Sequence, residues 1–349
     1  MGERTLLTKK KMTHSHLDIT PRKILVIKPS SLGDVIHSLP FLNSIRKCFP
    51  QAEIHWVIAK EFQELPDSHP MIDKLWVINK GEWKVPSKAW DTLKEVMTLF
   101  RELKKERFDI TVDLQGLLRS GLITMASGAK IRIGLKGFKE GREGSRFFYT
   151  HRVSGGKFVH AVERYMRVAD FLGCDTSEIK FPLPDVSSVL PIAPPYAVIV
   201  PGARWQTKKW RSERFGELAS MLPIKSLVIG TNADDAIADE IVKASKGNAV
   251  SLTGKTNLKE LIGILKNAMF VVSTDSGPMH IASALSVPVF ALFGTTSPLR
   301  TGPYGDIHTI ITAGLPCAPC FKKRCDDLRC MDKITVEMLY NAIKEKIKV

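Results

Sequence analysis

The sequence lacks the features that define many membrane, cofactor-binding and nucleic-acid-binding proteins. No run of about 18 consecutive apolar residues occurs, so we expect no membrane span. The third glycine of a dinucleotide fingerprint and the Gly-Lys-Ser/Thr of a P-loop are missing near the first strand signal, which excludes both cofactor motifs. Helix-turn-helix, RNP and zinc-finger signatures are absent as well, and these are the usual signs of nucleic-acid recognition.

Acidic residues are scarce: 36 Asp and Glu stand against 51 Lys and Arg, which gives a formal net charge of +15. A basic surface favours nucleic acid, an anionic membrane or an anionic small substrate. Because nucleic-acid motifs are missing and the basic residues are spread along the chain, the sequence favours phosphates on a lipid or a sugar. A nucleic-acid binder is the competing interpretation, and it would bind with a steep salt dependence.

The six cysteines fall into two groups. Cys48 and Cys174 stand alone in apolar helical contexts, where we expect unreactive core thiols. The other four lie within fourteen residues: Cys317, Cys320, Cys325 and Cys330. Without a secretory signal, such crowding suggests metal or redox chemistry more than secreted disulfides. The four thiols could hold zinc or an iron–sulfur centre, but their spacing matches no standard pattern. A disulfide or free thiols are the alternatives, and we expect no catalytic role.

Short apolar strands alternate with helices twice along the chain, which predicts two parallel sheets covered on both faces. The expected strands are 23–28, 53–59, 74–78, 108–114, 196–200, 226–229, 249–252, 269–273 and 287–293. One expected helix follows the first strand and ends at residue 49. The other expected helices span 90–107, 160–172, 212–222, 234–245, 258–267, 277–285 and 336–347. The glycine-rich, basic stretch 134–157 predicts a mobile loop.

The domain limits follow from composition. Residues 1–20 are polar and lack the apolar core of a secretory signal, so we expect a disordered N-terminal extension. Prolines between 181 and 195 predict a linker that joins a first domain, 21–180, to a second, 196–335. The closing helix, within 336–349, could pack on either domain. Two doubly wound domains place a ligand in the cleft between them.

The first candidate motif, Ser30 to Pro40, follows the first expected strand. It places one carboxylate, Asp34, beside Gly33 at the carboxyl end of a buried strand. Such an aspartate is typical of a helix cap, and the local pattern alone favours that interpretation.

Three further motifs lie in the second half. Ser273 to His280 ends a strand and opens a helix, whose first amides, at Ser276 and Gly277, would favour an anion. An ordinary cap is the alternative. The next strand ends in another hydroxyl-rich turn that contains Thr295, and both turns should face one crevice. Lys208 lies in a basic loop after the strand 196–200, where it could neutralise a diphosphate or simply be solvated.

These motifs together resemble glycosyltransferase family 9, the ADP-heptose:lipopolysaccharide heptosyltransferases of Gram-negative bacteria. The resemblance runs from about residue 23 to the C-terminus. It is carried by Ser-Leu-Gly-Asp-Val-Ile-His-Ser-Leu-Pro at 31–40, Asp-Leu-Gln-Gly at 113–116, Lys-Lys-Trp at 208–210, Asp-Ser-Gly-Pro-Met-His at 275–280 and Gly-Pro-Tyr-Gly at 302–305. The family has the GT-B fold, in which two Rossmann-like domains face each other.

The resemblance also implies roles for individual residues. Asp34 would be the general base, and Lys208 would contact the departing diphosphate. The implied donor-binding residues are Asp275, Ser276, Gly277, His280, Thr295 and Asp234, with Asp235 as the alternative to Asp234. The implied acceptor-binding residues are Ser31, Gly33, Gln115 and Arg142. The Arg142-Glu143 pair looks like the heptosyltransferase I subgroup. Domain closure that raised the pKa of Asp34 would suit its role.

The resulting hypothesis is a glycosyltransferase that moves heptose from ADP-heptose to the Kdo-bearing inner core of lipopolysaccharide. No Asp-x-Asp occurs in the sequence, so we expect a metal-independent reaction without a required cofactor, and a single base opposite the leaving group implies inversion. The resemblance implies a cytoplasmic location, peripheral on the inner membrane, with no nucleic-acid partner. The alternatives are a family member with another donor or acceptor, and a non-catalytic protein that binds nucleotide sugar or anionic lipid.

Overall fold

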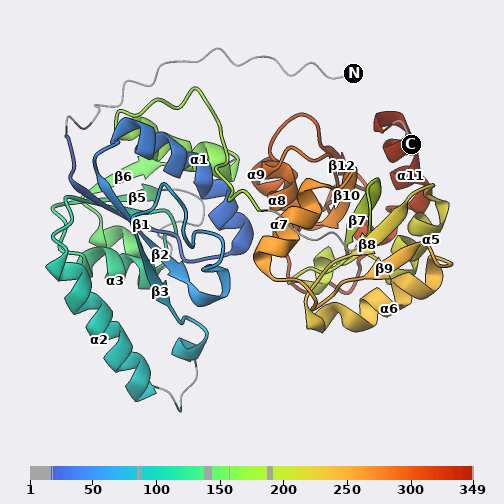
Figure 1. Ribbon diagram of the computed structural model, residues 1–349, viewed down its shortest axis with the longest axis horizontal. Helices are drawn as coiled ribbons and strands as arrows, with labels where there is room; N and C mark the ends of the chain where they lie inside the picture. Colours follow the sequence, from blue (N-terminus) through green and yellow to red (C-terminus); the bar gives the residue numbers. More distant parts are fainter. Residues whose placement is uncertain are drawn as a thin grey trace.

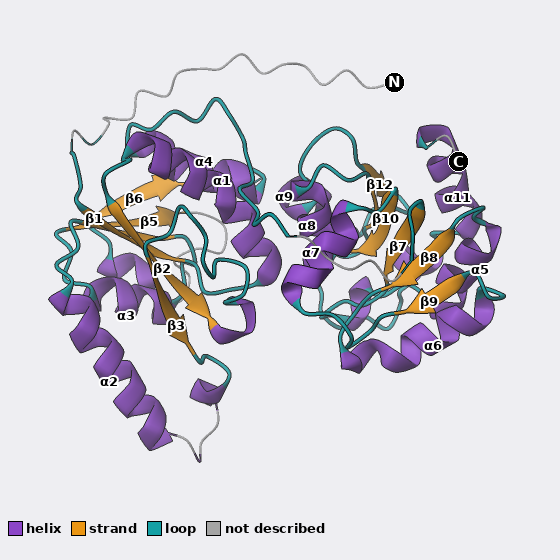
Figure 2. Ribbon diagram, viewed as in Figure 1, coloured by secondary structure: helices purple, strands orange, loops and turns teal. Residues whose placement is uncertain are grey.

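The computed structural model describes residues 17, 19–84, 87, 89–136, 144–156, 158–186 and 192–347. It contains two six-stranded parallel sheets, one in each half of the chain, with helices packed around them (Figures 1 and 2). The expected α/β class with two doubly wound sheets is confirmed. Most of the predicted N-terminal extension, and Arg142 with Glu143, lie outside the described residues.

The first sheet has the strand order β3-β2-β1-β4-β5-β6, with every pair parallel. Its strands are β1 (Lys23–Ile27), β2 (Glu53–Ala59), β3 (Lys74–Ile78), β4 (Ile110–Asp113), β5 (Ile131–Lys136) and β6 (His151–Ser154). Its helices are α1 (Leu32–Cys48), α2 (Ala89–Lys105), α3 (Leu118–Ala126) and α4 (Ala161–Phe171), with the 3-10 turns η1 (Lys60–Phe62), η2 (Glu82–Lys84) and η4 (Ser145–Phe148).

The second sheet repeats this winding, with the order β12-β11-β10-β7-β8-β9. Its strands are β7 (Tyr196–Val200), β8 (Lys225–Val228), β9 (Ala249–Ser251), β10 (Phe270–Thr274), β11 (Val289–Leu292) and β12 (Thr309–Ile311). Its helices are α5 (Ser212–Met221), α6 (Asp235–Ala244), α7 (Leu258–Lys266), α8 (Gly277–Ala284), α9 (Pro298–Thr301), α10 (Arg329–Asp332) and α11 (Val336–Lys346), with the 3-10 turns η5 (Gln206–Lys208) and η6 (Asn232–Asp234).

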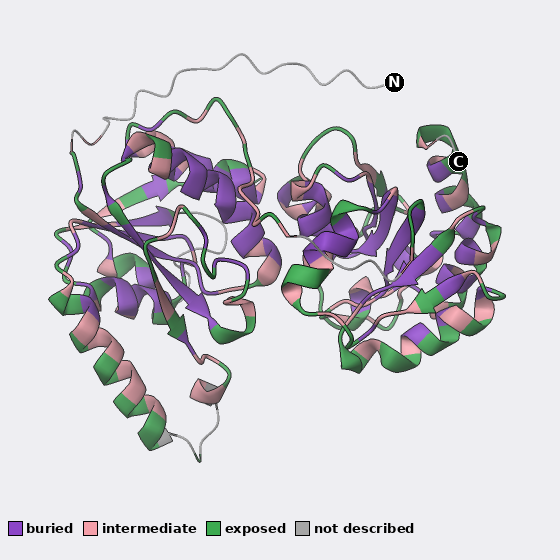
Figure 3. Cartoon of the chain, in the orientation of Figure 1, coloured by how far each residue is buried: buried purple, intermediate pink, exposed green. Residues whose placement is uncertain are grey.

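The central strands are buried on both faces, as Figure 3 shows, because their apolar side chains alternate between two cores, whereas the edge strands β3, β6, β9 and β12 are partly exposed. In β1, Ile24 and Val26 belong to the largest apolar cluster, whereas Leu25 and Ile27 belong to a separate cluster beneath α2 and α3. The largest cluster continues through α1 and α8 into β7 of the second sheet. The two halves therefore share one continuous core, and this fixes the residues at their junction.

The structure corrects the predicted mobile loop at 134–157. This stretch contains the end of β5, the turn η4 and the edge strand β6, while residues 137–143 and 157 lie outside the described residues. Gly134 allows the packing, because a Cβ there would lie 2.2 Å from Cε2 of the Tyr149 ring. A glycine that signals a loop in the sequence is thus needed for close packing of an aromatic ring against a strand.

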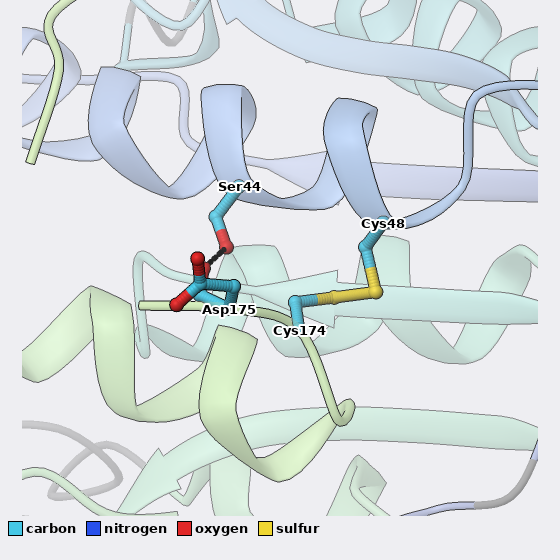
Figure 4. The surroundings of a disulfide bond; sticks show 4 residues. All are labelled: Ser44, Cys48, Cys174 and Asp175. Atoms are coloured by element: carbon cyan, nitrogen blue, oxygen red, sulfur yellow. Dashed lines mark hydrogen bonds between the residues drawn. A yellow bond between two sulfur atoms is a disulfide. The ribbon is translucent and has the colours of Figure 1, made fainter. Parts of the chain in front are cut away.

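The prediction of two core thiols was wrong. Cys48, at the end of α1, and Cys174, just after α4, form a disulfide (Figure 4). The Ser44 hydroxyl donates to the Asp175 carbonyl at 2.6 Å beside it, so α1 is tied to the segment after α4 at two points. The closing helix α11 packs against α5 and the second sheet. Within the described part of the chain, no helix has both the length and the apolar character needed to cross a bilayer.

Candidate active site

Four of the candidate site residues follow the two central strands of each sheet. β1 neighbours β4 in the first sheet, and β7 neighbours β10 in the second, so these pairs mark the points where strand order reverses. Doubly wound sheets bind ligands beyond the carboxyl ends of the strands at this point. β1 leads to Asp34, β4 to Gln115, β7 to Lys208 and β10 to Asp275. The topology therefore selects the same four motifs as the sequence.

Asp34 lies in the first turn of α1 and is half-buried. The Ser31 N–H and the Ser31 hydroxyl both donate to Asp34 Oδ2, at 3.1 and 2.8 Å. Asp34 thus closes a capping box at the start of the helix, which is the local role that the pattern favours. The cap fixes the carboxylate at the carboxyl edge of the first sheet, and its other oxygen, Oδ1, has no bond within the described residues.

A buried lysine sets the charge state of this carboxylate. The Lys28 ammonium donates to the Leu114 carbonyl at 3.1 Å and lies 5.1 Å from the centroid of the Tyr165 ring. Burial favours the neutral acid at Asp34, but Lys28 and the two Ser31 bonds outweigh it and hold the pKa of Asp34 below its ordinary value. Asp34 is therefore ionised at neutral pH. The raised pKa expected for Asp34 on domain closure is not found in this structure.

The first turn of α1 packs directly against the first turn of α8. A Cβ on Gly33 would lie 2.2 Å from Cδ2 of His280, and a Cβ on Gly277 would lie 2.8 Å from Cδ2 of Leu32. Both glycines are needed because the two turns approach more closely than side chains would allow. The first and second halves thus meet at the two most specific motifs of the sequence.

Three histidine rings lie at this junction. The His37 ring centroid is 4.3 Å from that of His280 and 5.1 Å from that of His160. Burial, helped by the neighbouring rings, holds the pKa of His37 well below its ordinary value. Neither nitrogen of His37 has a hydrogen-bond partner within the described residues. His160 is anchored at the same point, because its Nε2 lies 3.0 Å from the Gly302 carbonyl.

His280 connects the two halves of the site electrostatically. Burial lowers its pKa to about 4, against the attraction of Asp275 and Asp34, while Lys208 acts in the same direction as burial. One ring is therefore within electrostatic reach of both the candidate base and the candidate donor turn. At neutral pH the His280 ring is uncharged, so it separates the Asp34 and Asp275 carboxylates without adding a charge to the site.

Asp275 is the centre of the second half of the site. Its Oδ2 accepts from the Lys208 ammonium at 2.7 Å and from the Thr296 hydroxyl at 2.6 Å. Lys208 is also held by the Trp205 ring, whose centroid is 4.7 Å from the ammonium. Asp275 is buried, so its two partners compensate for the loss of water. The lysine is consequently fixed at the edge of the sheet and not solvated in a loop.

The structure places Thr295 and Ser276 differently from Thr296. The Thr295 hydroxyl is buried and has only long contacts to Thr207, at 3.3 and 3.5 Å. Ser276 is half-buried at the N-terminus of α8, and its hydroxyl lies 3.1 Å from that of Ser273. Of the two threonines, Thr296 is the one bonded to Asp275 in the candidate donor turn, whereas the sequence favours its neighbour Thr295.

Asp234 lies over the carboxyl ends of β7 and β8. A Cβ on Gly202 would meet Asp234 Oδ1 at 2.8 Å, and one on Gly230 would meet its Oδ2 at 2.9 Å. The Thr231 N–H and hydroxyl donate to the same Oδ2, so Asp234 caps η6. Asp235 points elsewhere, because its Oδ1 accepts from the Thr253 hydroxyl at 2.5 Å. The geometry therefore favours Asp234 over Asp235 at the sheet edge.

On the acceptor side, Gln115 is held by its own loop. Asp113 is fully buried, and its Oδ1 accepts from the amides of Gln115 and Gly116, while its Oδ2 accepts from the Tyr149 hydroxyl at 2.7 Å. Gln115 Oε1 in turn accepts from the Ser30 N–H at 3.2 Å, which links the loop after β4 to the loop after β1. Ser31 is exposed beside it, so both residues reach the edge that carries Asp34.

Comparison with known proteins agrees with this geometry. The model of glycosyltransferase family 9 (heptosyltransferase) matches residues 96–330, which is more than half of the chain. The chain belongs to glycosyltransferase family 9. Its predicted class, a glycosyltransferase, is thereby confirmed. Lipopolysaccharide heptosyltransferase 1 of Pseudomonas aeruginosa is 31% identical over 323 residues, which cover 87% of each chain. The Escherichia coli K12 protein of the same name is 28% identical over 302 residues, covering 83% of this chain and 93% of that one.

Solved structures show the same fold. A family 9 glycosyltransferase of Veillonella parvula superposes with a TM-score of 0.79 at 23% identity, over 95% of this chain and 98% of that one. The Escherichia coli heptosyltransferase WaaC with ADP gives a TM-score of 0.75 at 22% identity, over 93% and 99%. The expected GT-B architecture of two Rossmann-like halves is confirmed.

The four clustered cysteines are not supported as a metal centre in this family 9 chain. All four thiols are free, and Cys330 is the buried one. No three of their sulfur atoms lie within 4.8 Å of one another; within the described residues, the three ligand atoms that do so belong to Glu53, His55 and Glu106. Lys23 and Lys74 already bind both carboxylate oxygens of Glu106, so this second group is a paired ion cluster.

The residues that sequence reasoning missed are Lys28, His37, His160, Thr296 and Trp205. Lys28 had a weak signal, since a lysine directly after an apolar strand must either reach solvent or find a buried partner. Thr296 and Trp205 lie inside motifs that were noticed, but only the side-chain directions show their contacts with Asp275 and Lys208. His37 and His160 had no local signal, because their importance comes from a junction between distant segments.

Proposed function

We propose that this chain transfers heptose from ADP-heptose to the Kdo-bearing inner core of lipopolysaccharide, with inversion and without a metal ion. One observation carries the proposal: His280 packs on Gly33 beside Asp34 and interacts with the Lys208–Asp275 pair, so a base and a cation meet at one junction. The relatives named lipopolysaccharide heptosyltransferase 1 support the donor and acceptor classes.

In the proposed reaction, Asp34 removes the proton from an acceptor hydroxyl. Its low pKa makes it ionised and able to accept a hydrogen bond, and Oδ1 is the oxygen that the cap leaves for this purpose. The acceptor oxygen forms a bond to the anomeric carbon while the bond to the diphosphate oxygen breaks. Attack from the face opposite the leaving group inverts that carbon.

On the donor side, the chain's own groups receive the charge of the departing diphosphate. Lys208, oriented by Asp275, supplies the cation, and the Ser276 and Gly277 amides at the start of α8 supply hydrogen-bond donors. The absence of Asp-x-Asp from the sequence is consistent with a diphosphate held by protein groups in place of a metal ion. We assign the ribose contact to Asp234. We assign the support of Asp275 to Thr296 in place of Thr295.

On the acceptor side, we assign Ser31, Gln115 and the Gly33 backbone to the edge that receives the sugar hydroxyl. Arg142 keeps its role in contacting acceptor phosphate as a proposal from sequence, since it lies outside the described residues. A lipid-linked acceptor further implies that the protein works in the cytoplasm, peripherally on the inner membrane.

The direct test is turnover with ADP-heptose and a deacylated Kdo-bearing acceptor, with the product's anomeric configuration read by NMR. We expect transfer with inversion, at the same rate after EDTA treatment. If transfer occurs only from another nucleotide sugar, the proposed donor is wrong. Loss of turnover on chelation would refute the metal-independent mechanism. Tight nucleotide-sugar binding without transfer to any acceptor would show a binding protein instead.

A further inference from the structure

Helix α2 projects from the first sheet, and much of its length is exposed (Figures 1 and 3). Large apolar side chains form a stripe on the exposed side. One face, with Leu99 and Leu103, packs against the sheet. The opposite face carries Trp90, Leu93 and Met97, whose side chains are 68%, 50% and 60% exposed. Their spacing of three and seven residues places them on one side of the helix. Such a row of large exposed apolar side chains is a sign of an interaction surface.

The same stripe carries the basic residues of the helix. Lys94, Arg101 and Lys104 lie four, eleven and fourteen residues after Trp90, so they share its side of the helix, and all three are exposed. The Lys94 ammonium lies 5.9 Å from the centroid of the Trp90 ring. Cations and large apolar side chains are therefore interleaved along one exposed face.

The acidic residues of α2 lie off this stripe. Asp91, Glu95 and Glu102 fall about a third of a turn away from it. Glu95 accepts from the Asn79 amide and the Trp83 indole, and Glu102 is paired with Lys105 at 2.8 Å and with Arg101 at 3.5 Å. Arg101 is therefore partly compensated, whereas Lys94 and Lys104 have no carboxylate partner within the described residues and keep the outward face positive.

Two elements in the same part of the first half also carry exposed apolar side chains: α2 contacts α3, and α3 contacts η4. Met125 of α3 is 50% exposed, and Phe147 of η4 is 76% exposed with the Arg146 guanidinium 4.9 Å from its ring centroid. The sequence from 117 to 148 contains seven Lys and Arg against two Asp and Glu. A second exposed aromatic–cation pair therefore lies on the same half of the molecule.

We propose that this surface, made of Trp90, Leu93, Lys94, Met97 and Lys104, docks the protein on an anionic membrane. Interfacial helices combine apolar and basic side chains in this way, and each Lys or Arg near an anionic bilayer adds attraction. A second copy of the chain fits less well, since pairing this face with itself would bring like charges together. The proposal rests on the proposed function, which supplies a lipid-linked acceptor.

The position of the surface suits that acceptor. α2 begins after β3, so the Trp90 end of the helix lies toward the carboxyl edge of the first sheet. η4 also begins at this edge, because the Ser145 hydroxyl donates to the Gly116 carbonyl just beyond β4. Asp34 lies at the same edge, after β1. A protein docked through this surface would face the membrane with the side of the sheet that holds the candidate base.

Vesicle sedimentation tests the proposal with phosphatidylcholine alone and with added phosphatidylglycerol. We expect the full chain to bind the anionic vesicles. Lys94→Gln plus Lys104→Gln should lower its partition coefficient roughly fivefold for each cation removed. Trp90→Ser plus Leu93→Ser should lower the partition coefficient roughly tenfold or more. The matched control, Met338→Ser plus Lys344→Gln, removes an exposed apolar group and a cation from α11 and should bind like the wild type.

A transfer assay separates this proposal from the proposed function. Both α2 variants should keep wild-type turnover on a soluble, deacylated acceptor and lose it on acceptor embedded in anionic vesicles. Vesicle binding is measured without any substrate, so failure of the transferase assay would leave it intact. Equal binding of the α2 variants and the control, or equal binding to neutral and anionic vesicles, would overturn the proposal. The proposal would also be overturned if the chain bound no vesicles and instead sedimented as a dimer that Trp90→Ser plus Leu93→Ser dissociates.

Discussion

Gly33 and His280 are in direct contact across the junction between the two sheets. A Cβ on Gly33 would stand 2.2 Å from Cδ2 of the His280 ring, well inside any permitted contact. The turn that carries Asp34 and the turn that carries Asp275 are therefore held together at a point where only hydrogen fits. The candidate base and the donor turn behave as one packed unit in this structure.

The first prediction concerns this contact. Gly33→Ala should lower the free energy of unfolding by about 1–3 kcal/mol, because the ring or the turn must move, and it should also reduce turnover. Gly81→Ala is the matched control, since the nearest atom to its added Cβ is Asn79 Oδ1 at 3.8 Å. Denaturant unfolding and steady-state kinetics of both variants provide the measurement. Indistinguishable behaviour of the two variants would contradict the account.

The sequence predicted the elements that carry strong local signals. The apolar runs of β1, β2 and β7 agree with the structure to within a residue, because a strand buried in a parallel sheet must be apolar on both faces; the partly exposed edge strand β3 agrees as well. The four motifs after β1, β4, β7 and β10 were also found. They lie at the carboxyl ends of strands, where short loops carry the site.

What the sequence did not predict depends on distant contacts. The Cys48–Cys174 disulfide joins residues 126 positions apart, and neither cysteine has a local feature that marks a partner. The strands β5 and β6 were partly hidden in a glycine-rich stretch, because Gly134 serves the packing of Tyr149. The histidine junction likewise needs α1, α4 and α8 to meet before its members can be recognised.

A second prediction distinguishes two adjacent threonines. Thr296→Val removes the 2.6 Å hydrogen bond to Asp275, which orients Lys208, and should lower kcat/KM roughly tenfold or more. Thr295→Val removes only long contacts to Thr207 and should change kcat/KM by less than about threefold. A larger loss at Thr295 than at Thr296 would return the donor role to the residue that the sequence favoured.

A third prediction concerns pH. Burial lowers the pKa of His280 to about 4 from 6.5, so the unfolded chain binds a proton more readily between these values. Stability should therefore be complete above about pH 6.5 and fall as the pH drops toward 4, by up to about 3 kcal/mol from this residue. His37 and His160 act in the same direction, since burial lowers the pKa of each.

Asp113 acts in the opposite sense, because burial raises its pKa. The variant His37→Leu isolates the histidine contribution, since it removes one buried base and leaves Asp113 in place. Urea unfolding at about pH 7 and about pH 5 should show a smaller loss of stability for this variant than for the wild type. Equal losses of stability in the variant and the wild type would show that the histidine junction does not cause the pH dependence.

A fourth prediction counts thiols. Alkylation of the unfolded, unreduced protein should modify the four clustered cysteines and leave Cys48 and Cys174 linked, as read by mass spectrometry of peptides. Reduction should then expose both and lower stability by about 3–5 kcal/mol, because the bond closes a long loop. Cys48→Ser should lose the same stability without a reductant. Six modified cysteines before reduction would show that the disulfide does not form in the isolated protein.

The central claim is that Asp34 is the base opposite the donor turn. The most direct measurement is the turnover number of Asp34→Asn with saturating ADP-heptose and soluble acceptor, together with its calorimetric affinity for the donor. The amide keeps the size of the side chain but accepts no proton, so turnover should fall about 100- to 10,000-fold while donor affinity stays within about twofold. Turnover equal to that of the wild type would contradict the account.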